Sequence, residues 1–366
     1  MRKVSKISCL ATIAMLLFIL MSCSSQGEGS DSEFNISSSS EEMQAPVSSS
    51  AGLSSSSLAV NSSSSVAVGS SSSVAVGSSS SVVASSSSNV SSSSVAQSSS
   101  STTRTDAVRE ALTNDIPTSA TRINTYGTTQ TITYPSRRFG GTQTAVVVLP
   151  PNYNDGRLFP IMYFGHGITG SARANDMNSR TILGNLVASG EAKDMIIVYT
   201  NQWTPVTQAE VDAGNTMNSS NAYTPFINEW AENLHPYMLE NFPVAPGREN
   251  VAITGFSMGG NMAIRIWMAH PDKIGFVGLG DPPAIVTSST NIRNSAAGAV
   301  NAPRPWLILV TGAEPEGANS VGQGPQNISN ALTQNGFDNV WHFVPGSGHN
   351  QTVMTPHLYN FLRGIF

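Results

Sequence analysis

Cysteine is almost absent from this sequence of 366 residues, which contains only two. Both of them, Cys9 and Cys23, lie within the first 23 residues. The rest of the chain therefore has no disulfide framework, no thiolate ligands for a metal and no cysteine nucleophile. Covalent catalysis after residue 23 must use another side chain.

Positive charge is also scarce, since 18 Lys and Arg stand against 23 Asp and Glu and the formal net charge is -5. No basic patch can neutralise a phosphate backbone, which excludes a nucleic-acid partner. His and carboxylate residues show no spacing typical of a metal site. We therefore expect neither a metal nor another cofactor.

An apolar run from Ile7 to Met21 follows three basic residues at the start of the chain. This pattern predicts a signal peptide over residues 1–23, because the run is too short for a membrane-spanning helix. It ends in Leu-Met-Ser-Cys at Cys23 and resembles the bacterial lipobox, with ordinary signal cleavage as the alternative. We expect an exported protein whose membrane contact is a lipid on Cys23 only, on the outer membrane or cell surface.

Residues 24–103 contain 39 Ser among 80 residues, and the unit Ser-Ser-Ser-Ser-Val-Ala-Val-Gly occurs at 62–69 and again at 70–77. Such a composition buries too little apolar surface to offset the chain entropy lost on folding. The segment is predicted to be a disordered linker that holds a domain away from the cell surface.

Residues 104–366 fit one domain, which we expect to be monomeric. Their apolar runs are short, rich in β-branched residues and typical of strands buried on both faces. These runs are Ala145–Leu149, Ile161–Phe164, Met195–Tyr199, Val251–Ile253, Phe276–Leu279, Trp306–Val310 and Val340–Val344. Residues 129–134 are expected to pair with the first run as an antiparallel edge.

Segments of helical apolar spacing lie between these runs. They cover residues 182–187, 226–237, 258–270, 328–332 and 355–366. The alternation predicts an α/β fold, a doubly wound and mostly parallel sheet.

Ser257 lies at the centre of Gly255-Phe-Ser-Met-Gly259, between a predicted buried strand and a predicted helix. This is the nucleophile elbow of α/β-hydrolases, in which small flanking residues allow a tight turn that exposes the hydroxyl. The helix that follows offers its first N–H groups to a developing oxyanion, and the first of these groups belongs to Met258.

A serine nucleophile needs a histidine base, which follows it in the chain after a carboxylate. His342 lies inside a predicted strand and His357 on the last helix, whereas His349 follows the last strand in a Gly-rich loop. We assign His349 as the base.

Three residues are candidates for the carboxylate. Glu314 and Glu316 follow the strand Trp306–Val310, and Asp281 follows the preceding strand. The glutamates are preferred, Glu316 slightly over Glu314, and the identity of the acid stays open.

The second oxyanion donor is expected from the loop Gly165-His-Gly-Ile-Thr-Gly170, which follows the strand at 161–164. His166 within it is interpreted as structural.

The whole of 104–366 resembles carbohydrate esterase family 1, the feruloyl and acetyl xylan esterases of plant cell-wall degradation. The segments that carry the resemblance are Leu149-Pro-Pro-Asn-Tyr153, Gly165–Gly170, Leu234-His-Pro-Tyr237 with Asn241-Phe242, Gly255–Gly260, Asn335–Trp341 with Gly346–His349, and Pro356–Leu362.

The resemblance implies an α/β-hydrolase fold, Ser257 as nucleophile, His349 as base and the N–H groups of Ile168 and Met258 as oxyanion donors. The family usually has Asp where this chain has Glu314 and Glu316, and commonly Asp where this chain has Asn350. The implied activity is removal of feruloyl or acetyl groups from plant cell-wall polysaccharide such as xylan.

Two aromatic residues, Trp203 and Tyr223, are candidates for stacking on a sugar or cinnamoyl ring, or for packing on the core. The alternative function is a tethered polysaccharide-binding protein whose catalytic acid has decayed. A lipase or peptidase function agrees less well with the sequence, because neither an amphipathic lid nor a propeller-length partner domain is evident.

Overall fold

A computed structural model describes residues 104–366, except 215–219, 286 and 317–318. The predicted signal peptide (1–23), the lipid site at Cys23 and the predicted linker (24–103) lie outside the described residues. Within the described part, no helix has both the length and the apolar character needed to cross a membrane.

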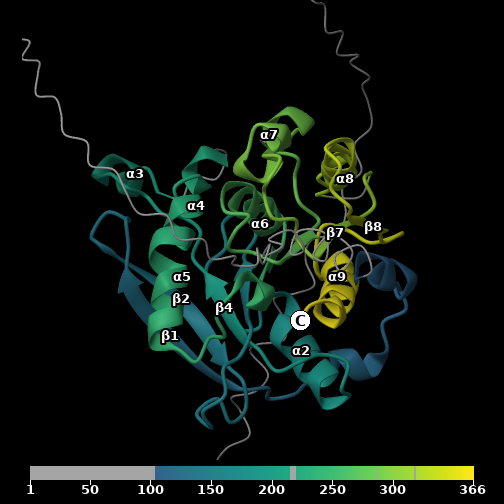
Figure 1. Cartoon of the computed structure of the whole chain (residues 1–366), viewed down its shortest axis with the longest axis horizontal. Helices are drawn as coiled ribbons and strands as arrows, with labels where there is room; N and C mark the ends of the chain where they lie inside the picture. The colour runs from purple at the N-terminus through teal and green to yellow at the C-terminus, as the bar shows by residue number, and fades with distance from the viewer. Residues whose placement is uncertain (1–103, 215–219, 286, 317–318) are drawn as a thin grey trace, which may run out of the picture. The chain divides into compact units, whose positions relative to one another are not determined.

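The described residues form an eight-stranded sheet in the order β1-β2-β4-β3-β5-β6-β7-β8 (Figure 1). Strand β2 is antiparallel to both neighbours, and all other pairs are parallel. The strands are β1 (Thr128–Pro135), β2 (Thr142–Leu149), β3 (Ile161–Gly165), β4 (Ile196–Thr200), β5 (Val251–Gly255), β6 (Phe276–Gly280), β7 (Leu307–Gly312) and β8 (Val340–Phe343). Strands β3 to β7 are buried throughout, as their β-branched apolar runs predict.

Helices cover both faces of the sheet and give each face its own apolar core. One face carries the helical residues 104–110, α2 (Ser179–Ala188) and α9 (Gln351–Gly364). The other carries α4 (Phe226–Glu229), η4 (Trp230–Leu234), α5 (His235–Asn241), α6 (Met258–Ala269), α7 (Ser289–Arg293) and α8 (Gly324–Gln334). Short elements in the connections are α3 (Gln208–Asp212), η1 (Thr118–Thr121), η2 (Asp176–Asn178), η3 (Ser220–Tyr223), η5 (Arg248–Asn250) and η6 (Ala296–Gly298).

The doubly wound α/β-hydrolase architecture is confirmed, including the antiparallel edge made by β1 and β2. The helix predicted at 226–237 extends to Asn241, and a π-helical turn at 230–234 interrupts it. A period of 3.6 cannot reveal such a turn, because one extra residue only shifts the stripe.

The loops that carry chemistry lie at one edge of the sheet, because parallel strands have their carboxyl ends on the same side. Strands β3, β5, β6 and β7 lead into residues 165–170, 256–261, 281–285 and 313–316 at this edge. The β1–β2 turn (136–141) reaches the same edge, because β2 runs antiparallel to β4.

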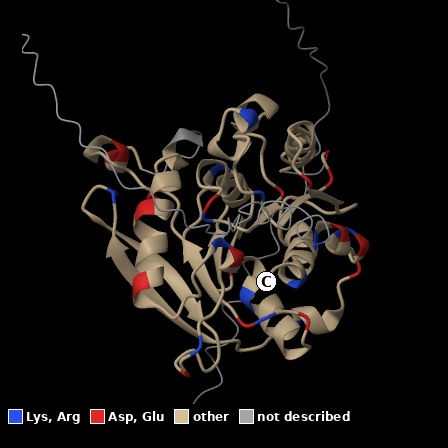
Figure 2. Cartoon of the chain, viewed as in Figure 1, with Lys and Arg blue, Asp and Glu red and all other residues tan. Residues whose placement is uncertain are grey.

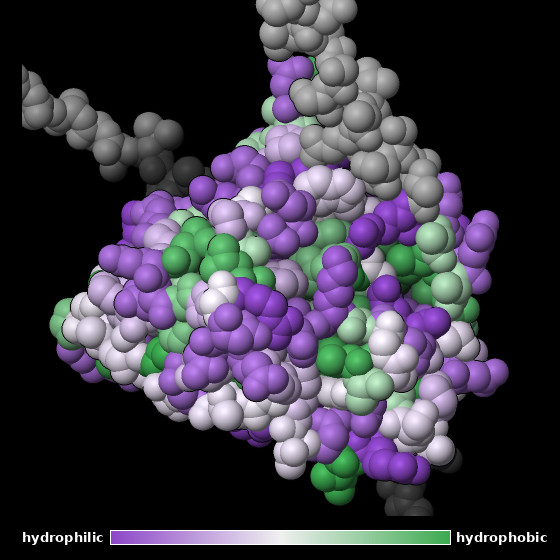
Figure 3. Space-filling view, turned by 60° about the horizontal axis from the view of Figure 1, so that its bottom comes forward, coloured by the Kyte–Doolittle hydropathy of each residue, from purple (hydrophilic) through white to green (hydrophobic). Residues whose placement is uncertain are grey.

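Charged residues of both signs are interspersed over the elements, and no face of one sign is visible in Figure 2. The face in Figure 3 is a mosaic of hydrophilic residues with small separate apolar groups. An extended apolar surface is not visible on this face.

His357 on α9 is fully buried against the sheet, where it bonds to residues of β5 and β7 on either side of β6. Its two ring nitrogens bond to the hydroxyls of Thr254 and Thr311, each at 2.9 Å. Burial lowers the pKa of His357 to about 3, and the charge of His342 contributes in the same direction. The folded protein therefore holds this ring neutral.

We expect this histidine to make folding stability fall in acid. Between a pH of about 6.5, the ordinary pKa, and the folded value, the unfolded chain binds a proton that the folded chain does not. The contribution is fully present above that window and is lost as the pH falls through it. In His357→Gln, the slope of unfolding free energy against pH should decrease by up to about 1.4 kcal/mol per pH unit, measured by urea denaturation. An imidazole that NMR shows titrating near its ordinary pKa in the folded protein contradicts this account.

Candidate active site

Ser257 occupies a strained turn between β5 and α6. Its backbone has φ 56° and ψ -117°, outside the regions that L-residues normally adopt, and its N–H donates to the carbonyl of Gly280 at 2.8 Å. The side chain is only slightly exposed, at 6% of the residue surface. A strained serine at the end of a buried strand is the geometry of a nucleophile elbow.

Three glycines allow the chain to make this turn. A Cβ on Gly259 would lie 2.0 Å from the carbonyl oxygen of Gly165, and one on Gly255 would lie 2.5 Å from the same atom. A Cβ on Gly165 would lie 2.8 Å from the Cα of Gly259. The elbow and the loop after β3 therefore approach as closely as two backbones can.

His349 connects the serine to a carboxylate. Its Nε2 lies 2.9 Å from Ser257 Oγ, and its Nδ1 lies 2.5 Å from Asp281 Oδ2. The ring of Phe256 packs on the imidazole with centroids 4.6 Å apart. The arrangement gives the imidazole one nitrogen for the serine proton and one for the carboxylate.

Asp281 is held rigidly at the end of β6. It is 1% exposed, its N–H donates to the carbonyl of Thr311 at 2.8 Å, and its Oδ1 accepts from the N–H of Ala313 at 2.9 Å. Its φ of 47° directs the chain out of the strand, in a region that Asp tolerates better than most residues. The remaining oxygen, Oδ2, faces His349.

The preference for Glu316 or Glu314 as the acid is therefore corrected to Asp281, the third candidate. Glu316 is exposed, and the Oε2 of Glu314 accepts from the N–H of Gly346 at 3.4 Å. The backbone N–H of Glu314 also donates to the carbonyl of Ser347 at 3.1 Å. Glu314 thus supports the loop that carries His349 and does not contact the imidazole.

Asn261 on α6 is a site residue that the sequence analysis missed. Its fully buried Nδ2 donates to the carbonyls of Pro283 and Ile285, at 2.9 and 2.8 Å. The amide thereby joins the nucleophile helix to the loop after Asp281. The signal in the sequence was its position directly after Gly259 and Gly260.

The loop 165–170 lies against the serine, as an oxyanion-hole loop must. A Cβ on Gly167 would lie 3.7 Å from the Cβ of Ser257, and Ile168 follows directly. Met258 is the first residue of α6, where a helix N–H has no intrahelical acceptor. Both backbone N–H groups assigned to the oxyanion hole therefore belong to segments that border Ser257.

His166 is structural in this loop. Its Nδ1 bonds to the carbonyl of Gly167 at 2.7 Å, and its Nε2 lies 3.4 Å from the N–H of Gln202. Burial lowers the pKa of His166, which keeps the ring neutral. The imidazole fixes the turn on which Ile168 lies.

The other residues singled out in the sequence divide between site and core. Trp203 is half-buried at the active-site edge, whereas Tyr223 is fully buried in the core and cannot stack on a ligand. His342 is buried and bonds to Asn114 at 2.7 Å. Asn350 caps α9, its side chain accepting from the N–H of Thr352 at 2.8 Å.

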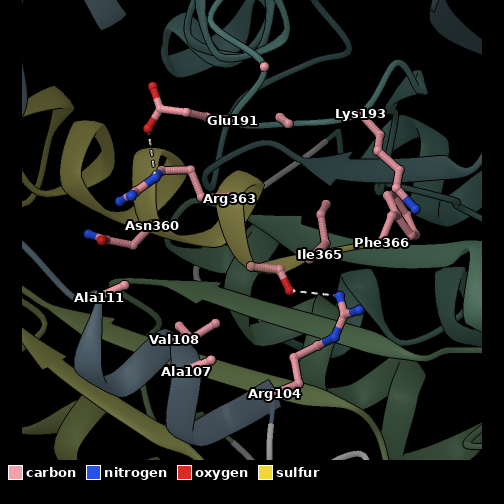
Figure 4. Close-up of a pocket in the computed structure, with 13 residues that line it drawn as sticks. Arg104, Ala107, Val108, Ala111, Glu191, Lys193, Asn360, Arg363, Ile365 and Phe366 are labelled. Atoms are coloured by element: carbon pink, nitrogen blue, oxygen red, sulfur yellow. Dashed lines mark hydrogen bonds and ion pairs between the residues drawn. The ribbon is translucent and has the colours of Figure 1, made fainter.

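A cavity of about 950 Å³ lies away from Ser257, between residues 104–111, the segment 190–193 and the end of α9 (Figure 4). Within it, Arg363 pairs with Glu191 at 3.0 Å, and Arg104 donates to the carbonyl of Gly364 at 3.1 Å. No serine lines this cavity, so it is separate from the reaction centre at Ser257.

Comparison with known proteins gives consistent matches. The Esterase family model matches residues 136–320, which include Ser257 and Asp281. An endo-1,4-beta-xylanase/feruloyl esterase of Xylanibacter ruminicola is 27% identical over 167 residues, 42% of this chain. The match spans only 21% of the length of that curated relative.

Solved structures extend the likeness to the fold. A CE1 ferulic acid esterase from Anaeromyces mucronatus, in complex with ferulic acid, matches with a TM-score of 0.63 and 28% identity. The match covers 70% of this chain and 97% of that one. The feruloyl esterase module from Clostridium thermocellum, complexed with sinapinate, shares the fold with a TM-score of 0.53 and 17% identity, over 69% of this chain and 92% of that one.

Proposed function

Because the chain belongs to the Esterase family and resembles a CE1 ferulic acid esterase in fold and sequence, we propose that it removes feruloyl or acetyl groups from plant cell-wall polysaccharide such as xylan. That it is an ester hydrolase on an α/β-hydrolase fold follows from the family itself. The observation that carries the proposal is the continuous chain of short contacts from Ser257 through His349 to Asp281.

The proposed mechanism has two acyl transfers. Ser257 Oγ attacks the ester carbonyl while His349 Nε2 takes its proton, and the N–H groups of Met258 and Ile168 stabilise the oxyanion. The imidazolium, paired with Asp281, then gives the proton to the departing sugar alkoxide. Water, deprotonated by His349, attacks the acyl-enzyme and releases the carboxylic acid and free Ser257.

The substrate class rests on the relatives. The curated relative is described as a xylanase/feruloyl esterase, and one structural neighbour holds ferulic acid. We extend this activity to the present chain. We also propose export and a lipid anchor at Cys23, which keep the enzyme at the cell surface, next to insoluble polymer. The alternative of a non-catalytic binding protein depended on a decayed acid, and Asp281 removes that reason.

A fluorophosphonate probe tests the proposal without presupposing the acyl group. We expect one covalent adduct per chain, located on Ser257 by peptide mass spectrometry, and slower labelling while saturating 4-nitrophenyl acetate is present. Parallel turnover of methyl ferulate and acetylated xylan then identifies the natural acyl group. A folded protein that neither reacts with the probe nor hydrolyses any of these esters refutes the enzymatic function.

A further inference from the structure

A second, polar pocket of about 360 Å³ adjoins the oxyanion loop at the same edge of the sheet. Three segments form it: the β1–β2 turn with the start of β2, the residues after β4, and the loop after β3. Its lining includes Arg138, Gln143, Thr144, His166, Asn201 and Trp203. Because His166 also fixes the turn of Ile168, the pocket and the reaction centre share one loop.

Arg138 is the only residue with a permanent charge in this lining, and no acid is present there. Its guanidinium lies over the Trp203 indole, 5.8 Å from the ring centroid. Among the described residues, no carboxylate lies within ion-pair distance of Arg138, whereas the neighbouring Arg137 pairs with Glu232. The pocket therefore carries one uncompensated positive charge beside an aromatic surface.

The turn that presents Arg138 is built to hold it. The N–H of Gly141 donates to the carbonyl of Arg138 at 2.8 Å, and the N–H of Phe139 donates to the carbonyl of Pro205 at 2.7 Å. The fully buried carboxylate of Glu229 accepts from the N–H of Arg137 at 2.9 Å. These bonds tie the turn to the segment after β4 and to α4, so the backbone that carries Arg138 is positioned before any ligand arrives.

The backbone of Trp203 is also held in place. Gln143 donates to its carbonyl through Nε2 at 3.1 Å. Asn201 is also committed internally, since its Nδ2 donates to the carbonyl of Thr144 at 3.0 Å and its Oδ1 accepts from the N–H of Ala172 at 2.7 Å. Of the polar groups described here, the guanidinium keeps free hydrogen-bond donors for a ligand.

We propose that this pocket binds an acidic sugar of the polysaccharide, a hexuronosyl residue close to the scissile ester, with its carboxylate on Arg138 and its ring beside Trp203. This inference rests on the proposed function and specifies its substrate. The acyl part of the ester has no charge before cleavage, so an anion next to the reaction centre must come from the glycan. A planar guanidinium binds a carboxylate through two parallel hydrogen bonds, and an indole offers an apolar surface to the C–H face of a sugar.

The test compares two acetylated xylo-oligosaccharides that differ only in a glucuronosyl substituent beside the ester. For the native protein we expect a kcat/KM ratio, acidic over neutral, of about tenfold or more at low salt, falling as salt screens the charge. Arg138→Gln should bring the ratio to about one, and Arg138→Lys should keep part of it. Arg122→Gln, which removes the same charge from a surface turn, is the matched control and should keep the full ratio.

Three further measurements separate this inference from the esterase proposal. The native protein and Arg122→Gln should hydrolyse 4-nitrophenyl acetate at the same rate, because Arg122 lies in neither the reaction centre nor the pocket. In Ser257→Ala, titration calorimetry should show tighter binding of the acidic oligosaccharide, and the added substitution Arg138→Gln should abolish the difference. A native ratio of one, or a ratio that survives Arg138→Gln, overturns the inference, whereas loss of 4-nitrophenyl acetate turnover in the native protein counts against the esterase.

Discussion

Replacing Ser257 with alanine is expected to lower kcat for ester hydrolysis by about a million-fold, and His349→Ala should have nearly the same effect. The reason is the geometry of the relay. The serine hydroxyl is a weak nucleophile until the imidazole, 2.9 Å away, takes its proton. Without either partner the acyl-enzyme does not form, and only the oxyanion hole and substrate binding remain.

The double variant Ser257→Ala/His349→Ala provides a sharp check, because residues that act as one unit are not additive. Its kcat should equal that of either single variant within about threefold, as each already stops the same step. Ser329→Ala is the matched control, since it removes a buried serine hydroxyl on α8 that bonds Asn339 at 2.6 Å. Its stability should fall by about 1 kcal/mol with kcat unchanged. Multiplicative losses in the double variant contradict a shared proton transfer.

The architecture could be predicted because its signal is local. Each central strand is a short apolar run, most of them bounded by Gly or Pro, and burial on both faces removes the alternation that would mark an edge strand. The elbow was equally visible, because Gly255 and Gly259 are required by contacts with Gly165 that leave no room for a Cβ. The apolar runs and the Gly-x-Ser-x-Gly pattern each occupy a few consecutive residues, so both are visible in the sequence.

The acid could not be predicted in the same way, since its identity depends on which strand end faces His349. Asp281 and Glu314 both follow strands, β6 and β7, and these strands are neighbours in the sheet. The structure separates them by contacts between distant segments: Asp281 receives the N–H of Ala313, while Glu314 turns to the N–H of Gly346. One signal was present in the sequence. Asp281 directly follows β6, which is the neighbour of the elbow strand β5, whereas the two glutamates lie further along the loop after β7.

The polar pocket escaped sequence analysis for a related reason. Arg138 lies in an exposed turn, where a charge is usually solvated, and Trp203 is separated from it by 65 positions of the chain. Only the antiparallel pairing of β2 with β4 brings their segments to one edge. An arginine in a turn becomes a candidate binding residue when the fold brings an aromatic side chain and a pocket next to it.

Asp281→Asn is expected to lower kcat by about ten-thousandfold while leaving the fold intact. The amide retains Oδ1 for the N–H of Ala313, so the loop geometry survives. What changes is the partner of His349 Nδ1: an amide NH₂ at Oδ2 favours the tautomer whose Nε2 carries a proton, and that nitrogen can no longer accept from Ser257. The loss should appear in kcat, with KM for methyl ferulate nearly unchanged.

Glu314→Gln and Glu316→Gln are the matched controls, because each replaces a carboxylate in the neighbouring loop with an amide of the same shape. Glu316 is exposed and should give native kinetics. Glu314→Gln weakens one long bond to Gly346 in the loop that carries His349, so a loss of less than about tenfold is expected. If instead Asp281→Asn were active and one of the glutamine variants inactive, the acid would come from the loop after β7, and the 2.5 Å contact between Asp281 and His349 would not be the catalytic one.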